Sequence, residues 1–192
     1  HTVRGYEAAG VTAIQMEDQE YPKKCGHTPG RRVVPLEDMV AKIKVASDNR
    51  SSEDFLIIAR TDSRTTLGLD EALRRGEAFV EAGADVVFVE APEAEAEMQM
   101  INDRIGAPTL ANMVSGGKTP ILSSARLAEI GYAIAIHPAL GFLAVGEALK
   151  KSYGELLETG DVANADLDDF GEFSKLMGFQ DVWDFDKKWA EV

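Results

Sequence analysis

The stretch Glu81-Ala-Gly-Ala-Asp-Val-Val-Phe-Val-Glu90 decides the fold class, because it joins a helix end, a glycine and a run of four apolar residues. Gly83 suits the left-handed position that ends a helix, since glycine carries no Cβ atom. A short run that is apolar on both faces is what a parallel sheet covered by helices requires. The same order of helix end, glycine and apolar run recurs at residues 7–17 and 129–137.

Further strands and helices are predicted around these three stretches. Apolar runs at residues 55–60 and 108–112 add two strands, which gives five in all. Amphipathic patterns predict helices over residues 35–48, 70–82 and 125–130, with Asp70 and Ser123-Ser124 as N-caps. Strands that alternate with helices indicate an α/β fold with a parallel sheet.

The chain changes character after residue 138. Residues 140–157 predict a long amphipathic helix, and residues 158–169 form an acidic connector. The tail beyond the connector is rich in Phe, Trp, Leu and Met. We therefore expect two parts: residues 1–138, which form α/β units, and residues 139–192, a helical segment that packs on the first part or on a partner subunit.

Composition and charge exclude several classes of protein. The chain has 192 residues, 45% of them hydrophobic, which is typical of a globular protein and not of a disordered one. Its 33 acidic and 20 basic residues give a net charge of −13, which disfavours nucleic acid and anionic membranes as partners. Cys25 is the single cysteine, so no disulfide forms within the chain, and we expect a reducing cytoplasmic setting.

Polar side chains stand where the predicted strands end, namely Glu17, Arg60, Glu90, Asn112 and His137. Each of them alone is as well explained as a helix cap or a structural contact as by a function. Together they point to a site, because the carboxyl ends of parallel strands meet at the rim where α/β proteins bind ligands. The oxygen ligands among them suit Mg²⁺ better than a softer metal.

The most informative segment is the cysteine loop, Tyr21-Pro-Lys-Lys-Cys-Gly-His-Thr-Pro-Gly30. A lone cysteine is usually inert packing. Here Lys23 and Lys24 precede Cys25, and cationic neighbours favour a reactive thiolate. We interpret the loop as a mobile flap that brings a thiol and positive charge to an anionic substrate. His27 is either a donor to that anion or a hydrogen bond within the loop.

Five motifs, in this order and with these spacings, carry a family resemblance: Glu17-Asp-Gln19, Lys23-Lys-Cys-Gly-His27, Ala59-Arg-Thr-Asp62, Val89-Glu-Ala91 and Ala111-Asn-Met113. With these motifs the chain resembles the isocitrate lyase/phosphoenolpyruvate mutase superfamily from about residue 3 to residue 157. The resemblance implies a (β/α)8 TIM-type barrel, of which this chain would hold strands four to eight. It also implies a homotetramer in which C-terminal helices are exchanged between subunits.

The resemblance also implies a metal site and a role for each matching residue. In the family, an Asp-x-Asp pair holds Mg²⁺, with Mn²⁺ as the alternative. No such pair occurs ahead of Glu17 in this sequence. We therefore expect the direct ligands upstream of this chain and a water-mediated role for Glu17. The remaining roles fall to the loop and to the strand ends: Cys25 as acid/base, Arg60 to neutralise developing charge, Glu90 and Asn112 to hold a carboxylate or the water shell of the metal, and Lys24, Gly26 and His27 to close the flap.

The cysteine loop also indicates the branch of the superfamily. Carbon–carbon lyases and oxaloacetate hydrolases of the superfamily carry the Cys-Gly-His element, and the chain looks most like the short lyases that act on 2-methylisocitrate, 2,3-dimethylmalate and related 2-alkylmalates. Pro138 stands where we expect serine in the hydrolases. The alternatives are an oxaloacetate hydrolase or decarboxylase, and a catalytically inactive half-barrel that serves in assembly or binding.

Overall fold

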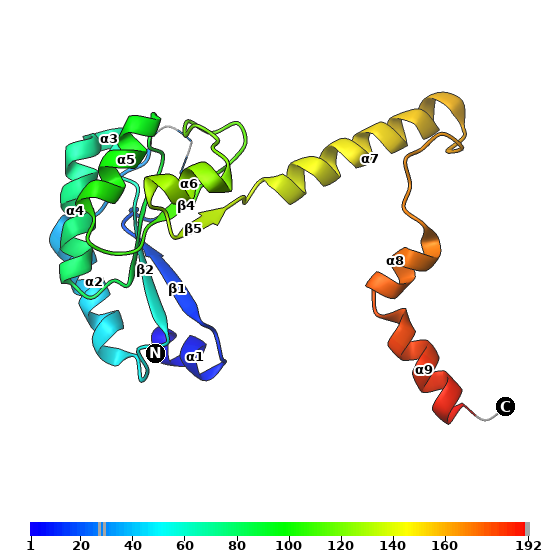
Figure 1. The fold of residues 1–192 in the computed structure, drawn as a ribbon, viewed down its shortest axis with the longest axis horizontal. Helices are drawn as coiled ribbons and strands as arrows, with labels where there is room; N and C mark the ends of the chain where they lie inside the picture. Colours follow the sequence, from blue (N-terminus) through cyan, green and yellow to red (C-terminus); the bar gives the residue numbers. More distant parts are fainter. Residues whose placement is uncertain (27, 29, 191–192) are drawn as a thin grey trace. The chain divides into compact units, whose positions relative to one another are not determined.

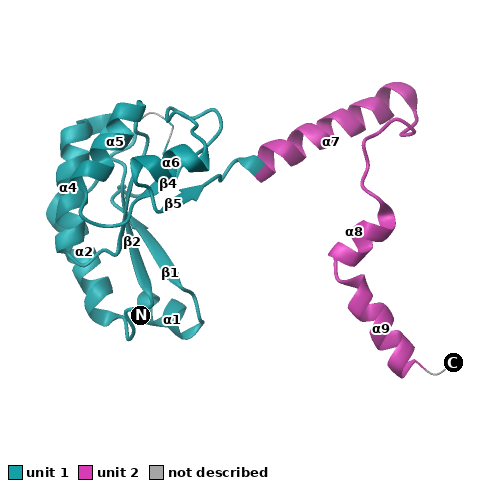
Figure 2. Cartoon of the chain, viewed as in Figure 1, with its two compact units in different colours: residues 1–140 teal, residues 141–192 magenta. Residues whose placement is uncertain are grey.

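The computed structural model describes residues 1–26, 28 and 30–190. Two compact units divide the chain, residues 1–140 (unit 1) and residues 141–192 (unit 2), and they are coloured separately in Figure 2.

Parallel strands form the centre of unit 1 (Figure 1). One sheet has the order β1 (Ala13–Glu17), β2 (Leu56–Thr61) and β3 (Val86–Val89). A second sheet pairs β4 (Leu110–Asn112) with β5 (Ile134–Ile136), and a parallel bridge between Val87 and Thr109 links the two sheets. All these pairings are parallel, which confirms the predicted α/β class.

The strand register sets up the site. Glu17, the last residue of β1, is the partner of Arg60 on β2, and Arg60 is in turn the partner of Phe88 on β3. Residues paired across parallel strands lie side by side on one face of the sheet. The carboxyl ends of all three strands therefore bring their polar residues to one edge.

The helices of unit 1 are α1 (Thr2–Ala8), α2 (Leu36–Asn49), α3 (Arg64–Leu67), α4 (Leu69–Glu81), α5 (Glu95–Arg104) and α6 (Ser124–Ile130). In Figure 1, α2 and α4 lie along one side of β2, whereas α1 lies near the lower end of β1 and α6 lies beside β4. Met39 and Ile43 of α2 and Phe79 of α4 are fully buried against Ala59 and Val87 of the sheet. Burial of such side chains contributes about 1.5–3 kcal/mol each, so this layer holds β2 and β3 in place.

The helix boundaries confirm one predicted cap and correct another. Ser123 caps α6, where its Oγ accepts a hydrogen bond from the Arg126 amide at 3.2 Å. The cap predicted at Asp70 is wrong: α4 begins at Leu69 with Gly68 before it, and no side-chain cap is formed. Gly68 has a φ of 90°, which lets the chain turn into the helix one residue earlier than the polar pattern indicated. Asp70 lies instead in the first turn of the helix.

Unit 2 consists of helices with few buried side chains. Its elements are α8 (Phe170–Leu176), α9 (Phe179–Trp189) and nearly all of α7 (Leu140–Thr159), which begins one residue before the unit. Large apolar side chains such as Phe142, Phe170 and Phe185 are exposed, so their packing partner stays a prediction. Among the residues that the structure describes, no helix is long and apolar enough to cross a membrane.

Candidate active site

Arg60 is the centre of the polar cluster at the strand ends. Its Nη2 atom lies 2.9 Å from Oε2 of Glu90, and its Nε atom lies 3.4 Å from Oε2 of Glu17. The guanidinium also lies over the ring of Phe88, 4.8 Å from its centroid. Three residues predicted from three different strand ends, Glu17, Arg60 and Glu90, are thus brought together.

Asn112 extends the cluster from the second sheet. Its Nδ2 donates to both carboxylate oxygens of Glu90, at 3.2 and 3.3 Å. Its Oδ1 atom is buried and has no hydrogen-bond partner among the described residues. A buried amide oxygen without a partner costs free energy. Asn112 therefore offers a ready acceptor for a donor group of a ligand or of bound water.

The backbone that follows Glu90 is strained. Ala91 has a φ of 59°, in the left-handed region that residues other than glycine seldom adopt, and it is fully buried. Such conformations cost of order 1–3 kcal/mol and cluster at functional sites. The strain at Ala91 falls on the residue next to the carboxylate that pairs with Arg60.

Asp62 binds the guanidinium of Arg60 at two points. Arg60 Nε donates to Asp62 Oδ2 at 2.8 Å and Nη2 donates to Oδ1 at 2.9 Å. Burial acts to raise the pKa of Asp62, but the hydrogen bonds and charge of Arg60, with contacts from Gln19 and Arg31, outweigh it and hold this pKa below its ordinary value. Asp62 is therefore ionised at neutral pH.

The charge of Arg60 is secured in the same way. Burial acts to lower its pKa, and the carboxylates of Asp62, Glu90 and Glu17 more than compensate, so the pKa of Arg60 is raised. The site thus contains a permanent, partly desolvated positive charge. Charges in such surroundings act more strongly on a bound anion than they would in water.

Asp18 fixes the backbone beneath the cluster. It is fully buried, and its Oδ1 accepts the Asp62 amide at 2.9 Å. Its Oδ2 accepts the Thr61 hydroxyl at 2.7 Å and Arg75 Nη1 at 2.9 Å. This network ties the end of β2 to helix α4, so Asp62 and Arg60 are held by the packed part of unit 1.

The cysteine loop packs directly on the cluster through Gly26. Gly26 is buried, and a Cβ atom at this position would lie 2.5 Å from Arg60 Nη2 and 2.9 Å from Cδ of Glu90. Real side chains do not approach so closely, so this contact requires glycine. Cys25 precedes Gly26 and is exposed. His27, which the sequence placed at the site, lies outside the described residues.

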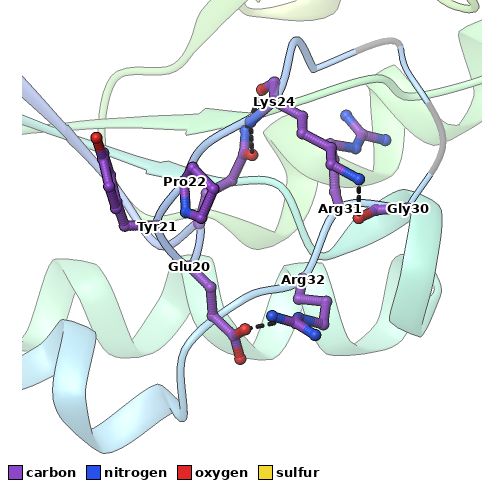
Figure 3. A pocket seen from close by; sticks show the side chains of 8 residues that line it. Glu20, Tyr21, Pro22, Lys24, Gly30, Arg31 and Arg32 are labelled. Carbon is purple, nitrogen blue, oxygen red and sulfur yellow. Dashed lines mark hydrogen bonds and ion pairs between the residues drawn. The ribbon is translucent and has the colours of Figure 1, made fainter.

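The two lysines of the loop have different partners. Lys23 Nζ lies 3.0 Å from Glu17 Oε1, at the cluster. Lys24 Nζ donates instead to the Gly30 carbonyl at 3.1 Å (Figure 3). This bond joins the two stems of the cysteine loop, the outgoing stem at residues 19–24 and the returning stem at residues 30–34. The structure thus brings Lys23 to the cluster, and the substrate contact predicted for Lys24 stays a prediction. No feature of the Lys-Lys pair could have told the two apart.

The described residues do not by themselves form a metal centre. They contain no group of three His, Cys, Asp or Glu side chains placed to hold an ion. Glu17, the predicted water-mediated contact to the metal, is engaged by Lys23 and Arg60. The direct ligands of a metal ion and the water-mediated role of Glu17 therefore stay predictions.

The cluster combines a buried guanidinium with carboxylates at the carboxyl ends of parallel strands, and a loop that carries a cysteine packs on it. This combination defines a candidate active site for a small anionic ligand. The family model of phosphoenolpyruvate phosphomutase matches residues 1–157. The chain belongs to this family, within the phosphoenolpyruvate mutase/isocitrate lyase superfamily.

Curated relatives and solved structures agree with this placement. The chain is 48% identical to 2,3-dimethylmalate lyase of Eubacterium barkeri over 98% of its length and 66% of the relative's. It is 37% identical to 2-methylisocitrate lyase of Bacillus subtilis, over 100% of the chain and 64% of the relative. The chain thus spans about two thirds of the length of these lyases.

Two solved structures share the fold. Oxaloacetate acetylhydrolase in complex with 3,3-difluorooxalacetate superposes with a TM-score of 0.89 at 27% identity, over 97% of this chain and 64% of that one. Phosphonopyruvate hydrolase in complex with oxalate and Mg²⁺ superposes with a TM-score of 0.82 at 28% identity, over 98% and 66%.

Proposed function

We propose that the protein is a Mg²⁺-dependent carbon–carbon lyase that cleaves a 2-hydroxy di- or tricarboxylate, of the 2-alkylmalate or 2-methylisocitrate type, to a 2-oxoacid and a carboxylate. The observation that carries the proposal is the contact of Gly26 with the Arg60–Glu90 pair, since it places the cysteine loop over a fixed positive charge. The named lyases among the relatives support the same reaction class.

In the proposed reaction, Cys25 and Arg60 act on the carbanion that the cleavage produces. The proton of the substrate's 2-hydroxyl passes to solvent, C2 becomes the carbonyl carbon of the 2-oxoacid as the adjacent carbon–carbon bond breaks, and the electron pair of that bond passes to the carbon next to a carboxylate. Cys25 donates its thiol proton to that carbanion, and Arg60 stabilises the negative charge as it develops. Cys25 then recovers a proton from solvent. Its exposed position is consistent with that exchange.

Substrate binding is assigned to the neighbouring groups. Asn112 presents a buried oxygen without a partner, which suits a hydroxyl or water donor. Glu90 holds both Arg60 and Asn112 in place. Gly26, with Lys24 and His27, would close the loop over the ligand and exclude water. Mg²⁺, when bound, would polarise the oxygen atoms of the substrate, with Glu17 in contact through water and the direct ligands supplied by residues upstream of this chain.

The architecture and assembly belong to the proposal as well. The five strands that the described residues form would complete a (β/α)8 barrel together with further strands of the family fold, since five strands cannot close a barrel of this type. Residues 139–192 would pack on the barrel or on a partner subunit of a cytoplasmic homotetramer. The exposed aromatic side chains of α8 and α9, such as Phe170 and Trp189, support a partner of this kind.

A second candidate is the hydrolysis of oxaloacetate to oxalate and acetate. The likeness to oxaloacetate acetylhydrolase, at a TM-score of 0.89, favours it. The higher sequence identity is with 2,3-dimethylmalate lyase, at 48%, and this identity supports the lyase as our first candidate.

Product analysis separates these reactions. The intact protein is given 2,3-dimethylmalate, 2-methylisocitrate, 2-ethylmalate, isocitrate and oxaloacetate in turn, with Mg²⁺ and with a chelator. The proposal expects Mg²⁺-dependent release of a 2-oxoacid from one of the four hydroxy acids. Oxalate and acetate from oxaloacetate alone would establish the hydrolase instead, and pyruvate from oxaloacetate alone would establish a decarboxylase.

A further inference from the structure

Arg31 is a buried cation at the end of the cysteine loop. Its side chain is 1% exposed, and its Nη1 lies 3.3 Å from Oδ1 of Asp62. Its Nε and Nη2 atoms are buried and have no hydrogen-bond partner among the described residues. A buried guanidinium is stable when its donors are paired, so the position of Arg31 depends heavily on Asp62.

Asp62 is shared between two guanidinium groups. The same Oδ1 atom accepts from Arg60 Nη2 at 2.9 Å and from Arg31 Nη1 at 3.3 Å. Arg60 comes from strand β2, whereas Arg31 comes from the returning stem of the loop. A single carboxylate therefore connects the charge at the site to the segment that carries Cys25.

The outgoing stem of the loop is held independently. The Gln19 side chain accepts the Lys24 amide and donates to the Lys24 carbonyl, both at 3.0 Å. A cavity of about 180 Å³ lies between the stems and is lined by residues of both, including Lys24 and Gly30 (Figure 3). The stems are thus not packed against each other throughout, and anchors such as Arg31 can decide where the loop lies.

We propose that Arg31 is a positioning residue that couples the packed position of the cysteine loop to the orientation of Arg60 through the carboxylate of Asp62. When Arg31 occupies its buried position, the loop places Gly26 on Arg60, and Asp62 is held from both sides. When Arg31 leaves, the loop loses its inner anchor and Asp62 loses one of its two cationic partners. The effect on turnover rests on the proposed function, whereas the effect on the loop does not.

Arg31→Met tests this coupling against a matched neighbour, Arg32→Met. Met fills a similar volume and leaves no buried charge behind. Arg32 stands next in the chain, but its side chain is 76% exposed and pairs with Glu20 at 2.7 Å on the surface. Arg31→Lys is the conservative variant, since it keeps the charge and loses the planar fork.

Hydrogen exchange of the intact protein, followed by mass spectrometry over residues 19–34, reads the loop without any substrate. Amides in this stretch are hydrogen-bonded, among them those of Glu20, Lys24 and Val34. We expect exchange in Arg31→Met to be faster than in the wild type by about threefold or more, with Arg32→Met unchanged and Arg31→Lys between them. Asp62→Asn should loosen the loop as well, and the double variant should exchange no faster than Asp62→Asn alone.

Turnover supplies the second readout. We expect kcat of Arg31→Met to fall by about tenfold or more, with a smaller change in KM, partial recovery in Arg31→Lys and none of these effects in Arg32→Met. Equal loop exchange in Arg31→Met and Arg32→Met would overturn the proposal. Exchange in the Arg31→Met/Asp62→Asn double variant that equals the sum of the two single effects would also overturn it. If the wild type is active, an unchanged kcat in Arg31→Met would overturn it as well. If the wild type cleaves none of the substrates, the proposed function fails, and the exchange of the double variant still decides the coupling.

Discussion

Arg60 and Asp62, two residues apart along the chain, form a two-point ion pair in which Nε lies 2.8 Å from Oδ2 and Nη2 lies 2.9 Å from Oδ1. Side chains two residues apart at the end of a strand lie on the same face, which is why this pairing is available. The paired geometry fixes the plane of the guanidinium. Glu17 and Glu90 then meet a cation whose direction is already set.

Arg60→Lys removes this fixed geometry while it keeps the positive charge. An ammonium group cannot reproduce the two parallel hydrogen bonds to Asp62 and also reach Glu90. We expect kcat to fall by about 10²–10³-fold, as measured by 2-oxoacid release. Arg64→Lys is the control, because Arg64 pairs with Glu93 and Glu97 rather than with Glu17, Asp62 or Glu90. Equal losses in the two variants would contradict a special role for Arg60.

Gly26→Ala tests the contact between the loop and the site. The added Cβ would lie 2.5 Å from Arg60 Nη2, so either the loop or Arg60 must move. A displacement of about 1 Å at a reacting site costs of order 10²-fold in rate, and we expect a loss of that size. Gly106→Ala is the matched control, since nothing lies within 4 Å of a Cβ atom there. An active Gly26→Ala protein would mean that the packed loop is not the working one.

The depressed pKa of Asp62 predicts a pH dependence of stability. Because this pKa is lower in the folded protein than in the unfolded chain, Asp62 contributes stability above about pH 4, and the contribution is lost as the pH falls further. At neutral pH we expect Asp62→Asn to be less stable by about 3–5 kcal/mol, because buried Arg31 and Arg60 lose a shared partner.

The difference between the wild type and Asp62→Asn should narrow as the pH falls from about 5 toward 2. Urea unfolding followed by circular dichroism is the suitable measurement, because both tryptophans, Trp183 and Trp189, lie in unit 2. A difference that stays constant over this pH range would show that the ionised carboxylate is not the source of the stability.

Ser123→Ala tests the local account of helix α6. The hydroxyl satisfies the Arg126 amide at the start of the helix, and its loss should lower the free energy of unfolding by about 1 kcal/mol. Ser124→Ala removes a hydroxyl of the same kind from the first helical position, where it does not act as the cap. We expect Ser124→Ala to be nearly neutral, and a reversed order of the two variants would refute the assignment of the cap.

The strands and the core of the site could be predicted because both follow from local patterns. Apolar runs, three of them after a glycine at a helix end, marked the strands, and the parallel order then required Glu17, Arg60 and Glu90 to meet at one edge. The family resemblance added roles to these residues, and the family match confirms that resemblance. The roles themselves stay proposals.

The contacts of the cysteine loop with the site could not be predicted from the sequence. They depend on which of two adjacent identical residues meets the site, and the sequence does not distinguish the two. Arg31 and Arg32 are indistinguishable in the sequence, yet one is buried beside Asp62 and the other pairs with Glu20 on the surface. Lys23 and Lys24 present the same difficulty. In both pairs the path of the loop decides which partner each side chain meets, and no local propensity encodes that path.

The most direct test of the central claim is the Mg²⁺-dependent rate of 2-oxoacid release by Cys25→Ser, compared with the wild type on the substrate that it cleaves. A serine hydroxyl is a far weaker acid than a thiol, and Cys25 is exposed, so the change should leave the fold intact. The account predicts a loss of about 10²–10⁴-fold in kcat. A Cys25→Ser protein with a rate within about twofold of the wild type would contradict it, because the cysteine loop would then lie over Arg60 and Glu90 without taking part in the proton transfer.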